Sequence, residues 1–216
     1  MTAFKPILRA ALIGALALLA SACGTVRNTV EDGADKALML RGHDPVAYFT
    51  QKAAVKGNPA IKADHEGLTY RFVSEEHKRM FVATPARFVP AYGGACSDGA
   101  VYAVKTHGAT GEIFEVYKDR LFVFGYPPAR RHFLMETDRN IQLADGYWDS
   151  EMKDTPNNLQ NLKRIFLFRV PHYKTGEELE AEWRRRNPGK TSALPAETGA
   201  RRGWNASTRA MPAPAA

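Results

Sequence analysis

The chain has 216 residues, of which 30 are Lys or Arg and 23 are Asp or Glu, so its formal net charge is +7. From Arg184 to Ala216, seven basic residues accompany one acidic residue, whereas Gly24 to Trp183 carries 21 basic and 22 acidic residues. Because the excess charge lies in one terminal segment and not on a patterned face with stacking aromatics, it does not indicate nucleic-acid binding.

The first 22 residues have the pattern of a secretory signal. Two basic residues precede an uncharged apolar run from Ala10 to Leu19, and small residues follow it. The apolar run is too short to span a bilayer stably, so it predicts export and not a membrane-spanning helix. About 190 residues then remain, enough for one domain with a sizeable core or for two small ones.

Cys23 directly follows this segment, and two cleavage patterns compete there. The small residues fit ordinary signal cleavage, whereas a cysteine after an apolar run resembles a bacterial lipobox, with Ala20 where lipoboxes usually have Leu. We favour the lipobox, which implies that Cys23 carries a lipid and becomes the mature amino terminus. The chain is then expected in the bacterial periplasm, anchored to a membrane, and Gly24 favours the outer membrane. In either case Cys23 offers no structural disulfide to Cys96.

The rest of the chain divides into four segments. Residues 23–37 are polar and lack apolar periodicity, as in a tether, and an α+β domain is expected over residues 38–155. Residues 156–187 are expected to form an appended helical segment, since acidic residues precede basic ones from Thr175 to Arg186 and match the helix dipole. Residues 188–216 are interpreted as a disordered basic tail rich in Ala, Pro and Gly.

Two β-hairpins and flanking helices are predicted within the domain. Apolar residues alternate around a Gly-containing break between Asn58 and Val73, and again on both sides of a polar turn between Ile113 and Phe124. Ser74 is expected to cap a helix, because apolar residues follow it at helical spacing. A second, short helix is predicted from Pro85 to about Tyr92.

Three blocks of the chain together resemble the YHS-domain family. They are Gly42-His43-Asp44-Pro45-Val46-Ala47-Tyr48-Phe49, Thr69-Tyr70-Arg71-Phe72-Val73-Ser74-Glu75-Glu76-His77-Lys78-Arg79-Met80-Phe81, and the stretch from Pro85 through Tyr92-Gly93-Gly94-Ala95-Cys96. Their order and spacing resemble the exported bacterial form of the family, and the resemblance extends from about Leu38 to Met152. It implies a small YHS-like domain from a family that is regarded as metal-binding.

The resemblance also implies where metal ligands would lie. In cysteine-rich relatives the ligands are three cysteines, and the corresponding positions here are Ala47, Val73 and His77. Alanine and valine side chains cannot bind a metal, so the thiolate-rich site of those relatives cannot exist in this chain.

A rearranged metal site is the expectation that remains. Cys96 and His77 would supply a thiolate and an imidazole, and His43 or Asp44 would complete the site. Such donors suit copper or zinc, and we favour copper. Each residue also has a simpler interpretation: Cys96 as a packing residue beside the Gly-Gly pair, His77 as a helix-surface residue, and His43 and Asp44 as turn formers.

The predicted function is therefore that of an exported, lipid-anchored, non-catalytic protein that binds a soft or borderline metal in the cell envelope. The alternative is a metal-free module that binds a protein partner or a small ligand. Its candidate surface or pocket is aromatic and consists of Tyr48, Tyr92, Tyr147 and Trp148.

A weaker alternative is a thiol-dependent enzyme. Cys96 would be its nucleophile, and His77 or His107 would act as the base. A thioredoxin-like activity is disfavoured, because no second cysteine lies at short spacing from Cys96. His132 is interpreted as an ordinary surface or helix residue.

Overall fold

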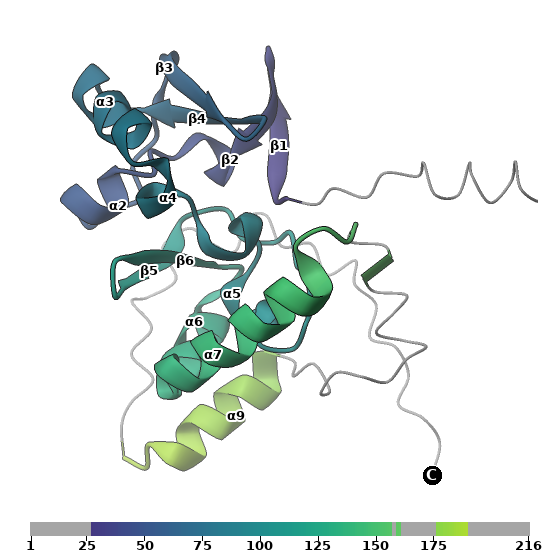
Figure 1. Cartoon of the computed structure of the whole chain (residues 1–216). Helices are drawn as coiled ribbons and strands as arrows, with labels where there is room; N and C mark the ends of the chain where they lie inside the picture. Colours follow the sequence, from purple (N-terminus) through teal and green to yellow (C-terminus); the bar gives the residue numbers. More distant parts are fainter. Residues whose placement is uncertain (1–26, 157–158, 161–175, 190–216) are drawn as a thin grey trace, which may run out of the picture.

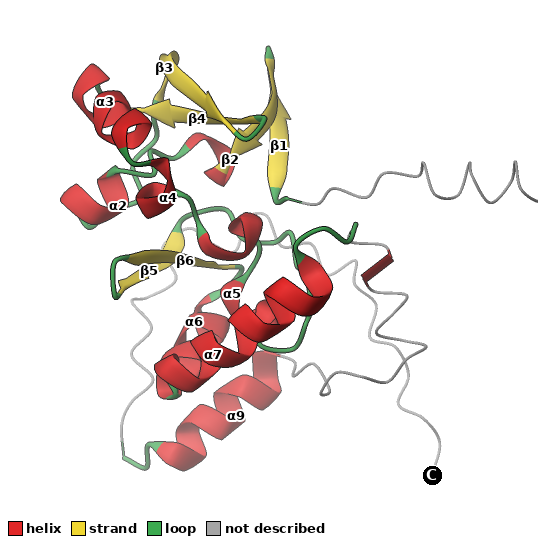
Figure 2. Ribbon diagram, in the orientation of Figure 1, coloured by secondary structure: helices red, strands yellow, loops and turns green. Residues whose placement is uncertain are grey.

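The structure is a computed structural model that describes residues 27–156, 159–160 and 176–189. Within these ranges helices surround two small β-sheets, so the predicted α+β class is confirmed (Figure 2). The signal-like segment, Cys23 and most of the basic tail lie outside the described residues. No helix within the described ranges is both long and apolar enough to cross a membrane.

The larger sheet has four strands in the order β1-β2-β4-β3. The strands are β1 (Thr29–Asp32), β2 (Asp35–Met39), β3 (Asn58–His65) and β4 (Leu68–Phe72). β3 and β4 form the antiparallel hairpin predicted from the sequence, whereas β2 and β4 run parallel. Glu66 and Gly67 in the hairpin turn both have positive φ angles, which tight two-residue hairpin turns require.

The predicted tether differs from the structure, because part of it forms the β1–β2 hairpin. The reason is an ionic contact with Arg71 on β4. The Arg71 guanidinium lies 2.6 Å from a carboxylate oxygen of Asp32 and 2.6 Å from one of Asp35. The acidic residues that gave this segment its polar, tether-like appearance are therefore the groups that bind it to the sheet.

Short helices pack beside this sheet. They are α2 (Ala47–Thr50), α3 (Glu75–Ala83) and α4 (Pro85–Phe88), with a 3₁₀ turn on either side, η1 (Leu40–Gly42) and η2 (Ala91–Gly94). The predicted cap of α3 is confirmed, because Ser74 Oγ accepts a hydrogen bond from the His77 backbone N–H. The helix predicted from Pro85 to Tyr92 is instead split into α4 and η2. Val89 and Pro90 are extended between them, and a proline disfavours helical backbone in the residue before it.

The second half of the described chain is mainly helical. It contains α5 (Ser97–Ala100), β5 (Ile113–Tyr117), β6 (Arg120–Phe124), α6 (Pro127–Met135), α7 (Thr137–Tyr147), the π-helical turn η3 (Trp148–Met152) and α9 (Gly176–Arg186). Figure 1 places the β5–β6 hairpin between the four-stranded sheet and the helices α5, α6, α7 and α9.

The predicted appended helix corresponds to α9, which packs on α6. Arg186 lies 2.9 Å from a carboxylate oxygen of Glu136, and the Arg131 guanidinium lies over the Trp183 ring at 5.5 Å. Thr175, the predicted cap of this helix, lies outside the described residues. Charged and aromatic contacts therefore hold α9 against the domain.

The β5–β6 hairpin joins two hydrophobic cores. The first core includes Tyr48, Phe72, Phe81, Phe88, Leu121 and Val123, and the second includes Tyr92, Cys96, Phe122, Phe124 and Phe133. Successive side chains of a strand point to opposite faces. Leu121 and Val123 therefore enter the first core, while Phe122 and Phe124 enter the second, and all four are fully buried.

Candidate functional site

Asp44 is the centre of the first block that carries the family resemblance. Its side chain is completely buried. One carboxylate oxygen, Oδ1, accepts hydrogen bonds from the backbone N–H groups of Val46 at 2.8 Å and Ala47 at 3.3 Å. These contacts satisfy donors at the start of α2, so the predicted turn-forming role of Asp44 is confirmed.

The second carboxylate oxygen of Asp44 reaches across to another segment. Oδ2 accepts hydrogen bonds from the Val73 backbone N–H at 2.8 Å and from His77 Nδ1 at 2.7 Å. The carboxylate thus fixes the orientation of the imidazole ring, and His77 Nε2 lies 3.4 Å from the Thr50 hydroxyl. His77 is accordingly a partly buried connector and not a free surface residue.

These contacts bring together the positions to which the resemblance assigns metal ligands. Ala47 is far in sequence from Val73 and His77, and each of the three contributes one donor to the Asp44 carboxylate. In this chain a carboxylate therefore occupies the place around which the three positions converge. Two of these donors are backbone N–H groups, which do not depend on the identity of the Ala47 and Val73 side chains.

Cys96 lies elsewhere, in the second hydrophobic core, and is 1% exposed. Burial, and next the negative charge of Asp98, raise the pKa of the thiol above its ordinary value of 9.0. The protonated thiol therefore dominates near neutral pH, and a protonated thiol is neither a good nucleophile nor a metal ligand. This environment fits the simpler interpretation of Cys96 as a packing residue.

Of the four predicted metal ligands, Asp44 and His77 are in contact, but the four do not form one site. Cys96, His77, His43 and Asp44 all lie in described segments, and among these segments no three His, Cys, Asp or Glu side chains are placed to hold one metal ion. His43 is buried, and its Nδ1 lies 2.8 Å from the Leu40 carbonyl oxygen. Burial lowers the pKa of His43, so a neutral imidazole that donates to this carbonyl is the favoured form.

The four aromatic residues predicted to form one surface or pocket do not do so, because two of them are buried. Tyr48 and Tyr92 are 0% and 4% exposed. Their hydroxyl groups are used internally, since Tyr48 donates to the Gly111 carbonyl at 2.8 Å and Tyr92 donates to Asp145 Oδ1 at 2.9 Å. Tyr147 and Trp148 are half-buried and pack against the second core. The four rings therefore form parts of two cores and not one binding surface.

A buried polar cluster between α5, α6 and α9 was missed by the sequence analysis. His132 is 6% exposed, and its Nδ1 lies 2.6 Å from Asp98 Oδ1. Its Nε2 lies 3.2 Å from the Tyr102 hydroxyl and 3.9 Å from Glu182 Oε2. No local pattern marks these residues, because the contacts join segments up to 84 positions apart between Asp98 and Glu182. The interpretation of His132 as an ordinary surface or helix residue holds only in part, because it does lie in helix α6 but is buried and not on the surface.

Two cations lie close to the Trp148 ring. The Arg27 guanidinium and the Lys105 ammonium are each 5.3 Å from a Trp148 ring centre. Arg27 donates to the Lys153 carbonyl oxygen at 2.7 Å, and Lys105 donates to the Thr155 carbonyl oxygen at 2.6 Å. Both cations thus bind carbonyl groups that follow the helical segment, where positive charge is favourable.

Lys105 predicts a pH dependence of stability. Burial, and next the charge of Arg27, lower the pKa of Lys105 to about 8 from 10.5. Between these values the unfolded chain binds more protons than the folded chain, so this lysine's contribution to the free energy of unfolding rises with pH. Urea denaturation of the wild type and of Lys105→Met between about pH 7.5 and about pH 9.5 should show the difference shifting in favour of the wild type. Parallel pH profiles would contradict the assigned pKa.

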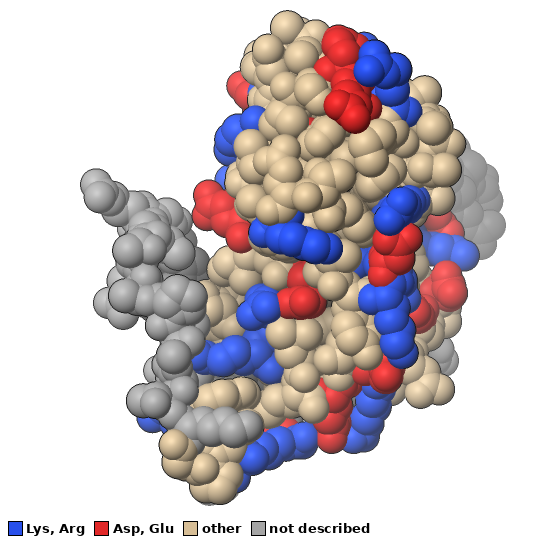
Figure 3. Space-filling model, turned by 90° about the vertical axis from the view of Figure 1, so that its left-hand side faces the viewer, with Lys and Arg blue, Asp and Glu red and all other residues tan. Residues whose placement is uncertain are grey.

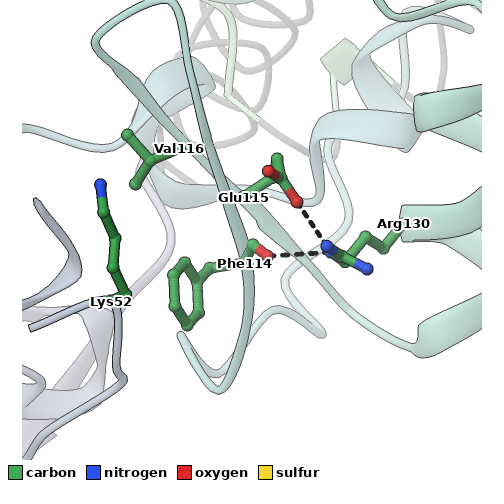
Figure 4. A pocket seen from close by; sticks show the side chains of 5 residues that line it. All are labelled: Lys52, Phe114, Glu115, Val116 and Arg130. Atoms are coloured by element: carbon green, nitrogen blue, oxygen red, sulfur yellow. Dashed lines mark hydrogen bonds and ion pairs between the residues drawn. The ribbon is translucent and has the colours of Figure 1, made fainter.

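A surface hollow of about 430 Å³ lies along β5. It is lined by Lys52, Phe114, Glu115, Val116 and Arg130. Figure 4 shows Lys52 beside Val116 on one side of the strand, with Glu115 and Arg130 on the other. On the face seen in Figure 3, Lys and Arg alternate with Asp and Glu over the described part of the chain.

No protein-family model, curated protein or solved structure matches the chain. The resemblance to the YHS-domain family therefore stays a prediction from the three sequence blocks.

Proposed function

We propose that the chain is a metal-independent, non-catalytic binding module of the cell envelope. The envelope location follows from the signal-like segment and from the lipobox-like position of Cys23. The observation that carries metal independence is the hydrogen bonding of the Asp44 carboxylate. The copper or zinc site expected from the sequence is the competing proposal.

The Asp44 carboxylate has its acceptor capacity filled. A carboxylate offers about four lone-pair sites. Four donors occupy them here: the backbone N–H groups of Val46, Ala47 and Val73, and the imidazole of His77. A metal ion at Asp44 would have to displace at least one of these buried donors, and an unsatisfied buried donor costs about 1–3 kcal/mol. The carboxylate thus supplies a link between α2 and α3 that needs no metal.

The proposed absence of catalysis rests on Cys96. A cysteine nucleophile requires a thiolate near neutral pH and access to a substrate. The Cys96 thiol is buried in the second core, and its pKa is raised. Binding at the exposed hollow along β5 is the role that the described surface favours.

Metal titration tests this proposal. The mature chain with Cys23→Ser, which removes the lipidation site, would be titrated with copper(I) under reducing conditions and with zinc. We expect no saturable 1:1 binding with a Kd below about 1 µM. A specific metal site would bind in that range, with a binding free energy of at least about 8 kcal/mol. His77→Ala and Cys96→Ser variants should take up the same small amount of metal as the parent.

A tight 1:1 site that disappears in His77→Ala or in Cys96→Ser would overturn metal independence. Because both residues are packed, circular dichroism must first show that each variant is folded. His65→Ala, at a half-buried position, would serve as a matched control for the loss of one imidazole, since His65 lies outside the Asp44 contacts.

A further inference from the structure

The register of the β5–β6 hairpin determines which backbone groups of β5 face outward. Lys118 and Asp119 form a two-residue turn with positive φ angles, and Tyr117 pairs with Arg120 across it. In such a turn the flanking pair is hydrogen-bonded, and bonded and non-bonded pairs then alternate along the ladder. Phe114 and Val116 therefore point their N–H and C=O groups away from β6.

Arg130 gives independent support for this register. Its Nε donates a hydrogen bond to the Phe114 carbonyl oxygen at 3.0 Å, which requires that carbonyl to face away from β6. The Phe114 N–H and both backbone groups of Val116 have no hydrogen-bond partner within the described part of the chain. β6 differs, because its other side meets Pro90 in a bridge at Leu121. β5 is thus the open edge of the hairpin.

The hollow beside this edge carries a cation that can select a ligand. Lys52 is exposed and makes no ion pair or hydrogen bond within the described residues. Arg130, in contrast, is already bound to Glu115 and to the Phe114 carbonyl. Among the residues that line the hollow, the unmatched charge is therefore positive, and it lies beside Val116 (Figure 4).

We infer that the outer edge of β5 binds an extended acidic peptide segment of a partner protein by β-strand addition, with a carboxylate of the peptide facing Lys52. The inference rests on the proposed function as a binding module and gives that module a class of partner. Main-chain hydrogen bonds to the Phe114 N–H and to both backbone groups of Val116 would supply affinity, and Lys52 would supply charge selectivity. β5 has five residues, so it spans about 17 Å and accommodates a short segment.

Charge favours an acidic partner over a segment of this chain. The apolar run Ile165-Phe166-Leu167-Phe168 is a candidate strand by composition, but Lys163, Arg164 and Arg169 flank it. A basic segment would place like charges near Lys52, which disfavours pairing. A second copy of β5 would likewise bring two Lys52 side chains to one edge.

Fluorescence anisotropy with the mature chain carrying Cys23→Ser provides the test. The acidic probe is a labelled eight-residue peptide of alternating Val and Thr with one central Asp. A second probe has Lys in place of Asp, and a third copies residues 163–170. The acidic probe should bind best, and Lys52→Glu should weaken it about fivefold while strengthening the Lys probe. Val116→Pro should weaken the acidic probe at least about tenfold, because it removes the outward N–H.

Two controls separate lost binding from lost folding. The Val116 N–H faces outward, so proline there removes no hydrogen bond to β6 and the variant should keep the wild-type circular dichroism spectrum. The second control leaves the protein unchanged. Two acidic probes are compared, one N-methylated on its odd residues and the other on its even residues, and only one of the two should lose binding.

Each remaining outcome bears on the inference. Equal binding of the acidic and Lys probes, or no binding of either at millimolar concentration, would overturn it. Tighter binding of the 163–170 probe would assign the edge to the chain's own segment, and dimerisation abolished by Val116→Pro would assign it to a second copy. None of these results concerns metal uptake, so the metal titration tests metal independence separately.

Discussion

Replacing Asp44 with alanine is expected to lower the free energy of unfolding by about 3–5 kcal/mol. The change leaves the buried N–H groups of Val46 and Ala47, the part-buried N–H of Val73 and the His77 imidazole without their acceptor. Each unsatisfied donor contributes a desolvation cost, and water can reach a completely buried site only if the turn opens. Urea denaturation of the mature chain, followed by circular dichroism, measures the loss.

The His77→Ala variant provides the comparison, because it removes only one of the four donors. It should cost about 1–3 kcal/mol, and Asp44→Ala combined with His77→Ala should cost less than the two single changes added together. The matched control for removing a carboxylate is Asp64→Ala, which affects an exposed residue whose carboxylate accepts from the Thr69 hydroxyl. A loss at Asp44 no larger than at Asp64 would contradict the proposed link between α2 and α3.

The hairpins could be predicted from the sequence because their signals are local. Alternating apolar residues define β3, β4, β5 and β6, and the turn residues between them tolerate positive φ angles. The capping of α3 by Ser74 is equally local, since the accepting Ser74 hydroxyl and the donating His77 N–H lie three residues apart. The β1–β2 hairpin could not be predicted in this way, because Asp32 and Asp35 are stabilised by Arg71, which lies on a strand distant in sequence.

The candidate site shows the same division between local and distant causes. The turn-forming role of Asp44 was predictable, since Asp before Pro is a familiar turn sequence. That its second oxygen reaches Val73 and His77 depends on how α2 packs against α3, which no local pattern encodes. The ligand type of His77 and Cys96 suggested one metal site, but ligand chemistry carries no information on distance. The packing instead places Cys96 in the second core.

Replacing Phe122 with alanine is expected to lower the free energy of unfolding by about 3–5 kcal/mol, because this ring is fully buried. Phe122 lies 5.3 Å from the Phe133 ring centre and 6.1 Å from that of Tyr92, so its removal leaves a cavity in the second core. Val82→Ala, at an exposed position, should change stability by less than about 0.5 kcal/mol and serves as the control.

The position of Phe122 on β6 also predicts which parts of the protein are destabilised by Phe122→Ala. Its neighbours Leu121 and Val123 enter the first core, so loosening β6 in the second core should also loosen the first. Native-state hydrogen exchange measures this directly, because amides of β4 and α3 should lose protection together with those of α6. If only α6 and α7 lost protection, the two cores would be separate cooperative units, and the hairpin would join them in space without coupling their stability. Loss across both cores would mean that the open edge of β5 is held rigid from two sides, which reduces the entropy cost of ordering it around a bound peptide.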